Sequence, residues 1–320
     1  MERLIVVSLL VVSVLALSFI LIYVFITNPV NILGKVTSTA KLNISVGTGT
    51  APEIVWVNVD SPYLPDLRQG PSNTNITINF TAKDAEGAAN LNDSSATVNI
   101  NRSGEVFRYT PACYKTNTIN NYVNYTCNIS LFWFDGDGTW TVNASIKDLA
   151  QNIVINKTKT LTINTLLGFT SGPGSILFDQ INAGATNTSS NNDPLTINNT
   201  GNQFIDYNEI EINATNLRGE LDNTRRLYSG NFSVGNSTGS NSECYINETL
   251  SAKGNATRMN ATAGNYVNIS QAILPDGNFT IDNGVTGQEQ LYFCILLAGS
   301  ELTPQAYSTL EEGSWTIRAT

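Results

Sequence analysis

Apolar side chains alternate with asparagine, serine and threonine along many short segments, and this two-residue period constrains the fold more than any other feature. The segment 75–82 reads Asn-Ile-Thr-Ile-Asn-Phe-Thr-Ala, so its apolar residues share one parity and its polar residues the other. The segments 124–131 and 140–146 follow the same rule. A strand with one buried and one solvated face has this period. We therefore predict an all-β protein built from antiparallel sheets.

The polarity of the chain comes from neutral side chains rather than charged ones. Charged residues make up 13% of the 320 residues, whereas 41 residues are Asn and 62 are Ser or Thr. A typical globular chain is about 25% charged. The net charge is −9, and no block of Lys or Arg is visible. Phosphate binding needs basic patches, so nucleic acid is not an expected partner.

Histidine is absent, which removes much catalytic chemistry. A Ser-His-Asp triad, a Cys-His dyad and His-ligated zinc or haem are all excluded. The string Gly235 to Gly239 fits the nucleophile-elbow pattern, but the chain has no histidine base to serve it. Glu209 and Glu211 share one outward face, unlike the shielded acid of a glycosidase. We expect no enzyme activity and no cofactor, with an envelope glycosidase as the remaining enzymatic alternative.

Residues 4–26 form a run of 23 residues without a charge. As a helix this run is about 34 Å long, enough to cross a hydrocarbon core of about 30 Å. A cleavable signal has an apolar stretch of roughly 7–15 residues. We therefore predict a retained transmembrane signal anchor over 1–27 and a stalk or linker over 28–51. The alternative is a cleaved signal, although the small-residue motif Ser38-Thr39-Ala40 lies far downstream.

Asn-x-Ser/Thr sequons, the acceptors of N-glycans, occur more than twice as often as composition predicts. Chance pairing of these residue types gives about 8. The sequence has 19, and none precedes residue 43. On the predicted strands they fall on the outward parity, where a glycan meets solvent. The single-pass protein is thus expected to have its C-terminal region outside the cell. The glycosylation candidates are Asn43, Asn75, Asn79, Asn92, Asn101, Asn124, Asn128, Asn143, Asn156, Asn187, Asn198, Asn213, Asn231, Asn236, Asn247, Asn255, Asn260, Asn268 and Asn278.

Four cysteines allow three disulfide connectivities. The local one pairs Cys113 with Cys127 and Cys244 with Cys294, and it keeps each bridge inside one predicted domain. Loops of these lengths contribute about 3 and about 4 kcal/mol in the chain-entropy model. A tetrathiolate metal site is the alternative, but no C-x-x-C spacing supports it.

Residues 52–165 are expected to form a β-sandwich of about seven strands. The segment 137–152, Asp-Gly-Thr-Trp-Thr-Val-Asn-Ala-Ser-Ile-Lys-Asp-Leu-Ala-Gln-Asn, resembles the penultimate strand and following turn of prokaryotic immunoglobulin-like surface modules. The segment 80–87 resembles an earlier strand and turn of the same modules. The resemblance implies an immunoglobulin-like fold without the antibody-type Cys–Trp–Cys spacing. The expected strands are 53–59, 75–83, 94–101, 105–109, 123–132, 139–147 and 152–163.

Residues 166–320 are expected to form a second, jelly-roll-like sandwich after a hinge at 170–174. The segment 194–202, Pro-Leu-Thr-Ile-Asn-Asn-Thr-Gly-Asn, resembles a turn of archaeal cell-surface β-sandwich domains and, distantly, camelysin and TasA-like fibre subunits. Those subunits polymerise by donating an N-terminal strand, a role that 41–46 would take here. The run 290–297 is apolar on both parities and predicts a buried central strand. The other expected strands are 175–182, 194–198, 204–214, 231–234, 243–248, 265–270 and 314–319.

Two further groups of residues are candidates for binding. Asp135 and Asp137 have the carboxylate spacing of a Ca²⁺-loop start, although no distal bidentate Glu follows, and a tight turn is the alternative. Carboxylates near other turns could instead build a Ca²⁺ site at the end of a domain. The four tryptophans favour packing in cores over sugar-stacking platforms. These carboxylates are Asp60, Asp84, Glu86, Asp93 and Asp148, and the tryptophans are Trp56, Trp133, Trp140 and Trp315.

Together these features predict a non-enzymatic, membrane-anchored glycoprotein of the cell surface, with two tandem antiparallel β-sandwich domains. The resemblances imply a prokaryotic, archaeal type of surface protein with a structural or adhesive role. One alternative is a surface module that binds a carbohydrate or a protein partner. The other is a filament subunit that self-associates by strand donation.

Overall fold

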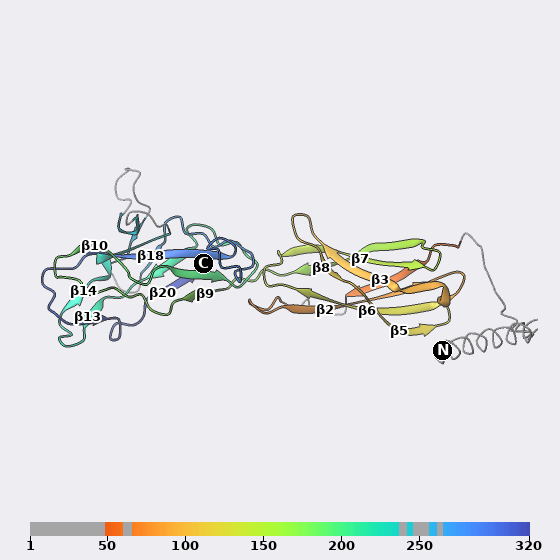
Figure 1. Cartoon of the computed structure of the whole chain (residues 1–320), viewed down its shortest axis with the longest axis horizontal. Helices are drawn as coiled ribbons and strands as arrows, with labels where there is room; N and C mark the ends of the chain where they lie inside the picture. The colour runs from red at the N-terminus through yellow and green to blue at the C-terminus, as the bar shows by residue number, and fades with distance from the viewer. Residues whose placement is uncertain (1–48, 60–65, 237–241, 246–255, 261–264) are drawn as a thin grey trace, which may run out of the picture. The chain divides into compact units, whose positions relative to one another are not determined.

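The computed structural model describes residues 49–59, 66–236, 242–245, 256–260 and 265–320 (Figure 1). These residues belong to one compact unit that starts at Gly49. Their regular structure consists of antiparallel strands and three short 3₁₀ helices, which confirms the all-β prediction. The predicted helix over 4–26 and the proposed donor strand 41–46 lie outside the described residues.

Two four-stranded antiparallel sheets make up the region from residue 53 to residue 163. The first sheet has the order β1-β2-β6-β5, and the second has the order β4-β3-β7-β8. Most of these strands span ten or eleven residues, and their burial alternates along the chain as the sequence predicts. Their bounds are β1 Glu53–Val59, β2 Thr74–Lys83, β3 Leu91–Asn101, β4 Arg108–Thr110, β5 Tyr114–Ile119, β6 Tyr122–Leu131, β7 Gly138–Asp148 and β8 Ile153–Ile163.

The inward residues of both sheets form one hydrophobic core, the N-terminal core, which runs in sequence from Ile54 to Ile163. Phe80 of β2 stacks on Tyr125 of β6 with ring centroids 5.0 Å apart. Trp140 of β7 is fully buried, and its Nε1–H donates to the carbonyl of Gly136 over 2.9 Å. An indole is accommodated in a core when its polar end finds such a partner. Packing was the expected role of Trp140.

Shorter strands and longer irregular segments make up the region from residue 169 onward. A larger sheet has the order β16-β15-β18-β11-β9, with β10 also paired to β18. Two three-stranded sheets have the orders β17-β12-β20 and β14-β13-β19. The bounds are β9 Phe169–Gly172, β10 Thr186–Ser189, β11 Leu195–Asn199, β12 Ile210–Asn213, β13 Leu217–Gly219, β14 Arg226–Leu227, β15 Phe232–Gly235, β16 Thr257–Arg258, β17 Tyr266–Asn268, β18 Gln288–Leu297, β19 Tyr307–Ser308 and β20 Thr316–Ala319.

Strand β18 is the centre of this region, as the apolar run 290–297 predicts. It pairs with β10, β11 and β15. Its Phe293 is fully buried in a second hydrophobic core, the C-terminal core. Trp315 packs edge-on against Phe232 of β15, with centroids 5.0 Å apart, so this tryptophan also serves packing.

Two strand predictions in this region were wrong, and the expected strand 204–214 forms only over Ile210–Asn213. The segment 175–182 has no regular structure, because its partly buried apolar residues pack on the C-terminal core from an irregular strap. In 243–248, residues 243 and 244 belong to the 3₁₀ helix Ser242–Cys244, and 246–248 lie outside the described residues. The expected hinge 170–174 overlaps strand β9, which pairs with β11. Strand β5 was not predicted, because all six of its residues are exposed and leave no alternating pattern.

The turn 199–202 lies between the two regions and is almost completely buried. The Asn202 Nδ2 donates to the carbonyls of Asp135 and Asn164, each over 3.0 Å, and its Oδ1 accepts from the N–H of Leu166 over 2.6 Å. A Cβ on Gly201 would approach the carbonyl oxygen of Leu166 to 2.0 Å, so glycine is required there. The turn therefore fastens the start of the C-terminal region to the N-terminal one.

Both disulfides have the local connectivity. Cys113 pairs with Cys127 across 14 residues, and Cys244 pairs with Cys294 across 50 residues. The first bridge joins the chain just before β5 to β6 at the edge of a sheet. The second ties the short helix that contains Cys244 to the central strand β18. The described residues contain no free cysteine, which leaves no thiolate for the alternative metal site.

Candidate functional site

The outward face of β2 and β6 is the most regular arrangement of functional side chains in the structure. The inward parity of β2 carries Ile76, Ile78 and Phe80, all buried. The outward parity of both strands carries Asn, Ser and Thr. The antiparallel register places each outward Asn of one strand directly opposite a hydroxyl residue of the other. We call this face the asparagine ladder.

We call two neighbouring cross-strand pairs of the ladder a rung pair. In the first rung pair, the sequons of Asn75 and Asn128 each donate a hydrogen bond to the other. The Thr77 hydroxyl donates to Oδ1 of Asn128 over 3.0 Å. The Ser130 hydroxyl donates to Oδ1 of Asn75 over 2.7 Å. Thr77 is the third residue of the Asn75 sequon, and Ser130 is the third residue of the Asn128 sequon. Each sequon therefore supplies the hydroxyl that holds the amide of the other.

The next two sequons repeat the arrangement. The Thr81 hydroxyl donates to Oδ1 of Asn124 over 2.7 Å, and the Thr126 hydroxyl donates to Oδ1 of Asn79 over 2.6 Å. Cross-strand polar pairs of this kind each contribute about 0.2–1 kcal/mol. The ladder thus stabilises the sheet while presenting four sequons on one face. The sequence predicts the outward parity of these residues, but the cross-strand register that pairs them is visible only in the structure.

The second sheet carries a sequon with the opposite amide orientation. The Nδ2 of Asn143 in β7 donates to Oδ1 of Asn99 over 2.7 Å and to Oδ1 of Asn101 over 2.9 Å, both in β3. Its own Oδ1 is buried and has no hydrogen-bond partner among the described residues. Here the nitrogen, rather than the oxygen, is used to join the strands.

The other described sequons occupy loops, short strands and strand ends, apart from Asn156, which lies within β8. Every sequon asparagine that the structure describes is at least partly exposed, including those that lie in the C-terminal region. Asn43, Asn247 and Asn255 lie outside the described residues. The others in this group are Asn92, Asn101, Asn156, Asn187, Asn198, Asn213, Asn231, Asn236, Asn260, Asn268 and Asn278.

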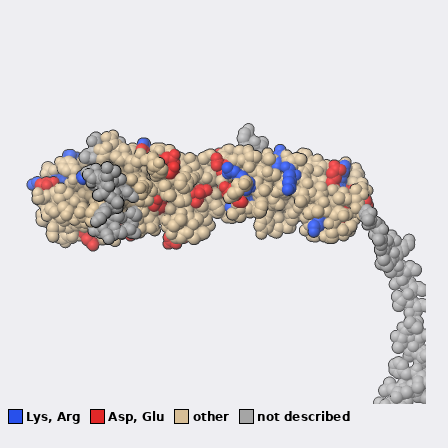
Figure 2. Space-filling model, turned by 90° about the horizontal axis from the view of Figure 1, so that it is seen from above, with Lys and Arg blue, Asp and Glu red and all other residues tan. Residues whose placement is uncertain are grey.

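The surface around these sites carries few charges. Figure 2 shows a face on which Lys, Arg, Asp and Glu occur as scattered small groups among neutral residues. Several of the charges are paired with each other, as in the contact of Lys83 with Glu53 at 2.9 Å and that of Lys115 with Asp93 at 3.0 Å. The water-facing character of the protein therefore depends on amides and hydroxyls.

Asp135 and Asp137 lie in different environments. The Asp135 side chain is 0% exposed; it forms an ion pair with Arg108, whose Nε lies 2.8 and 3.0 Å from the two carboxylate oxygens. The N–H of Phe132 donates to the same carboxylate over 2.8 Å. Asp137 is exposed and accepts from the hydroxyl of Thr165 over 3.1 Å. Within the described residues no three carboxylate, histidine or cysteine side chains gather as a metal site would require.

The other candidates from the sequence are also separated. Glu211 pairs with Arg318 at 2.5 Å, whereas Glu209 accepts from the N–H of Asp206 over 2.8 Å. Trp133 is buried, and Trp56 is 51% exposed on β1. Trp56 is the exposed indole among the described residues, so a stacking platform of several tryptophans is not formed.

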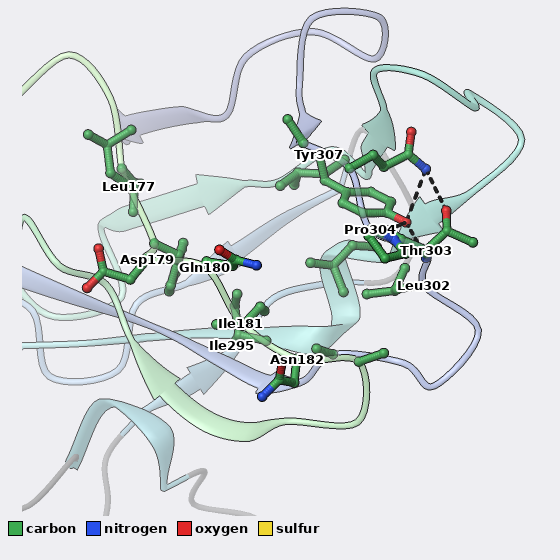
Figure 3. Close-up of a pocket in the computed structure, with 18 residues that line it drawn as sticks. Leu177, Asp179, Gln180, Ile181, Asn182, Ile295, Leu302, Thr303, Pro304 and Tyr307 are labelled. Carbon is green, nitrogen blue, oxygen red and sulfur yellow. Dashed lines mark hydrogen bonds between the residues drawn. The ribbon is translucent and has the colours of Figure 1, made fainter.

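A pocket of about 660 Å³ lies beside the strap 175–182, between it and residues 302–307 (Figure 3). Its floor is apolar and includes Ile181 and Ile295. The Tyr307 hydroxyl at its rim accepts from the N–H of Thr303 over 3.0 Å and donates to the carbonyl of Thr303 over 3.1 Å. The rim carboxylate, Asp179, accepts from Asn191 over 2.6 Å. The pocket offers an apolar floor with a few polar groups, which suits binding of a small ligand better than acid-base chemistry.

Three carboxylates of the C-terminal region, Glu243, Asp193 and Glu289, are buried or partly buried, and the sequence did not reveal them. Glu243 is 6% exposed and accepts from the Ser189 hydroxyl. Burial raises the pKa of Asp193 above its ordinary value, and the negative charge of Glu243 raises it further. Burial likewise raises the pKa of Glu289. These acids lie near turns and strand ends with no periodic signal, so the sequence does not indicate their burial.

Comparison with known proteins leaves the family open. No family model matches the chain, and no curated protein matches it in sequence. Among the described residues, none forms a helix of the length and hydropathy that a membrane span needs.

Proposed function

We propose that this chain is a non-enzymatic, N-glycosylated protein of the cell surface, anchored by residues 4–26 and exposed outside the cell from the stalk onward. Its role is structural or adhesive, in the manner of the archaeal surface proteins that its sequence resembles. The observation that carries the proposal is the asparagine ladder, which presents four sequons on one solvent-facing sheet surface.

Three further observations support an extracellular setting. Both disulfides suit an oxidising compartment, because cytosolic thiols are kept reduced. The sequon asparagines in the described part of the chain are all at least partly exposed, so glycans fit without unfolding the cores. The low charge content leaves a surface of amides and hydroxyls, which glycans extend with chemistry of the same kind.

The proposal includes two tandem β-sandwich domains, at 52–165 and 166–320. Supporting the first is its strand order, since β1-β2-β6-β5 and β4-β3-β7-β8 correspond to the A-B-E-D and C-F-G sheets of immunoglobulin domains, with β4 as an added edge strand. Supporting the second is a separate hydrophobic core that begins at Phe169. The segment 137–152 resembles surface modules and forms β7 and its turn, the penultimate strand of this order.

The test uses intact cells of the source organism. Protease added outside the cells should remove the chain beyond the stalk, and mass analysis of the purified protein should show sugar on at least some sequons. A chain that survives the protease on cells, yet is cut once the cells are lysed, would place it inside. A mass equal to that of the bare polypeptide would remove the glycoprotein part of the proposal.

A binding module is the second candidate, and the pocket beside the strap favours it. Its apolar floor and polar rim fit a small ligand or the side chains of a partner. A glycan array and a pull-down with the purified protein would separate this role from a passive structural one. Binding that is lost when Ile295 is replaced by a larger residue would support the module.

A further inference from the structure

The sequons differ in which atom of the asparagine amide the fold uses. N-glycosylation joins Nδ2 to the anomeric carbon of a sugar. The bond between that carbon and the phosphate oxygen of a lipid-linked donor breaks, and one amide proton leaves with the phosphate. The amide oxygen keeps its place in this reaction. A folded protein therefore tolerates the modification where the oxygen is engaged and the nitrogen faces solvent.

On the ladder the oxygen is engaged. Asn75 and Asn128 are both exposed, and each uses Oδ1 to accept the hydroxyl of the other's sequon. Neither Nδ2 has a hydrogen-bond partner among the residues that the structure describes. A sugar on either nitrogen leaves the cross-strand hydrogen bond intact.

Asn143 presents the opposite case. It lies on a long strand with outward parity and has a serine as its third sequon residue, as Asn128 does. Its Nδ2, however, donates to both Asn99 and Asn101. A sugar on that nitrogen takes at least one of the two protons and pushes the amide out of the sheet. Asn236 is of the same kind, since its Nδ2 donates to the carbonyl of Gln271 over 2.8 Å.

We infer that Asn75 and Asn128 of the asparagine ladder are glycosylated, whereas Asn143 and Asn236 are structural asparagines within unmodified sequons. The acceptor is the outward amide nitrogen, and the donor is a lipid-linked phosphosugar. The inference rests on the proposed function and deepens it by separating sequons whose amide nitrogen faces solvent from sequons whose amide nitrogen joins parts of the fold.

The test is glycopeptide mass spectrometry of the full chain purified from its source cells, with occupancy measured at each site. Breaking hydrogen bonds at Asn143 disfavours its modification, so occupancy at Asn128 should exceed that at Asn143 at least about tenfold. Equal or higher occupancy at Asn143, with glycans found elsewhere on the chain, would overturn the inference and leave the proposed function standing. Bare peptides at every sequon would overturn both.

A variant sharpens the comparison. The double substitution Asn99→Ala and Asn101→Ala removes both acceptors of the Asn143 nitrogen and should raise occupancy at Asn143. The matched control is Thr141→Ala, on the same strand and the same outward parity, which leaves the Asn143 bonds and the Ser145 hydroxyl of its sequon in place. If the double variant forms its disulfides correctly but shows unchanged glycan occupancy at Asn143, the hydrogen bonds of that nitrogen do not control its modification.

Discussion

The regions on either side of residue 167 reach a folded core by different means. The N-terminal region uses long strands whose burial alternates residue by residue, and the charged side chains that it buries, Asp84, Asp135 and Asp148, lie at strand ends or in loops. The C-terminal region uses strands of two to five residues around the single long strand β18, and it buries Asn199, Ser233 and Glu243. Both regions contain a disulfide and buried polar side chains, but the short strands of the C-terminal region form fewer backbone hydrogen bonds, so we expect that region to depend more on its covalent bridge and its buried polar contacts.

The largest expected effect is therefore the loss of the C-terminal disulfide. Replacing Cys244 and Cys294 by Ser should lower the free energy of unfolding by about 4 kcal/mol, because the bridge closes a long loop. The matched pair Cys113→Ser and Cys127→Ser should cost about 3 kcal/mol. Urea unfolding followed by tryptophan fluorescence measures both. A smaller cost for the C-terminal bridge would mean that its short strands hold together without it.

The second effect concerns the contact between the regions. Replacing Asn202 by Ala leaves the buried groups of Asp135, Asn164 and Leu166 without a partner and should cost about 2–3 kcal/mol. It should also separate the unfolding of the two regions into two transitions in calorimetry. The control is Asn182→Ala, at an exposed site, which should change neither the stability nor the number of transitions. A single unshifted transition for Asn202→Ala would contradict the role of the turn.

The ladder should show a smaller but specific coupling. In a double-mutant cycle, Thr77→Val and Asn128→Ala should be coupled by about 0.2–1 kcal/mol, since they remove the two ends of one hydrogen bond. The same cycle on Thr77 and Asn124, which belong to different rung pairs, is the control and should be additive. Chemical denaturation of the four proteins in each cycle gives the result, and equal coupling in both cycles would mean that the reciprocal pairing adds nothing.

The smallest effect is a dependence of stability on pH that arises from Asp193 in the C-terminal region. The pKa of Asp193 is raised by burial, so the folded state binds a proton more tightly than the unfolded state. Stability from this group therefore increases as pH falls through the folded-state pKa and is lost as pH rises. The variant Asp193→Asn lacks this pH-dependent contribution to the free energy of unfolding. Its stability relative to wild type should therefore decline as the pH is lowered from neutral. Parallel curves of melting temperature against pH would contradict this.

The same contrast explains what the sequence could predict. In the N-terminal region, β1 starts and ends where the alternation does, and β2, β6, β7 and β8 differ from expectation by one residue at each end at most. In the C-terminal region, the strap 175–182 has the composition of a strand, but the backbone groups of its Leu177 bond to Asn191 and Asn192, which belong to no strand. The buried turn 199–202 was recognised only as a resemblance, because its hydrogen bonds reach residues far away in the chain.

The candidate site also has features that the sequence predicts and features that it does not. Parity alone placed Asn75, Asn79, Asn124 and Asn128 on an outward face, and the local disulfides were preferred because each stays within one predicted domain. Whether the oxygen or the nitrogen of an amide is engaged could not be predicted, because it depends on which residue the register sets opposite each asparagine. The pocket and the buried acids of the C-terminal region are not marked by any sequence pattern.

The reciprocal pairing of sequons has a consequence for inheritance. A mutation that changes Thr77 abolishes the acceptor motif at Asn75 and at the same moment releases the amide of Asn128. A change at either hydroxyl residue therefore affects both sites, and natural variants of the chain should retain Thr77 and Ser130 together. Under the proposed function, selection for glycosylation and selection for sheet stability act on the same residues.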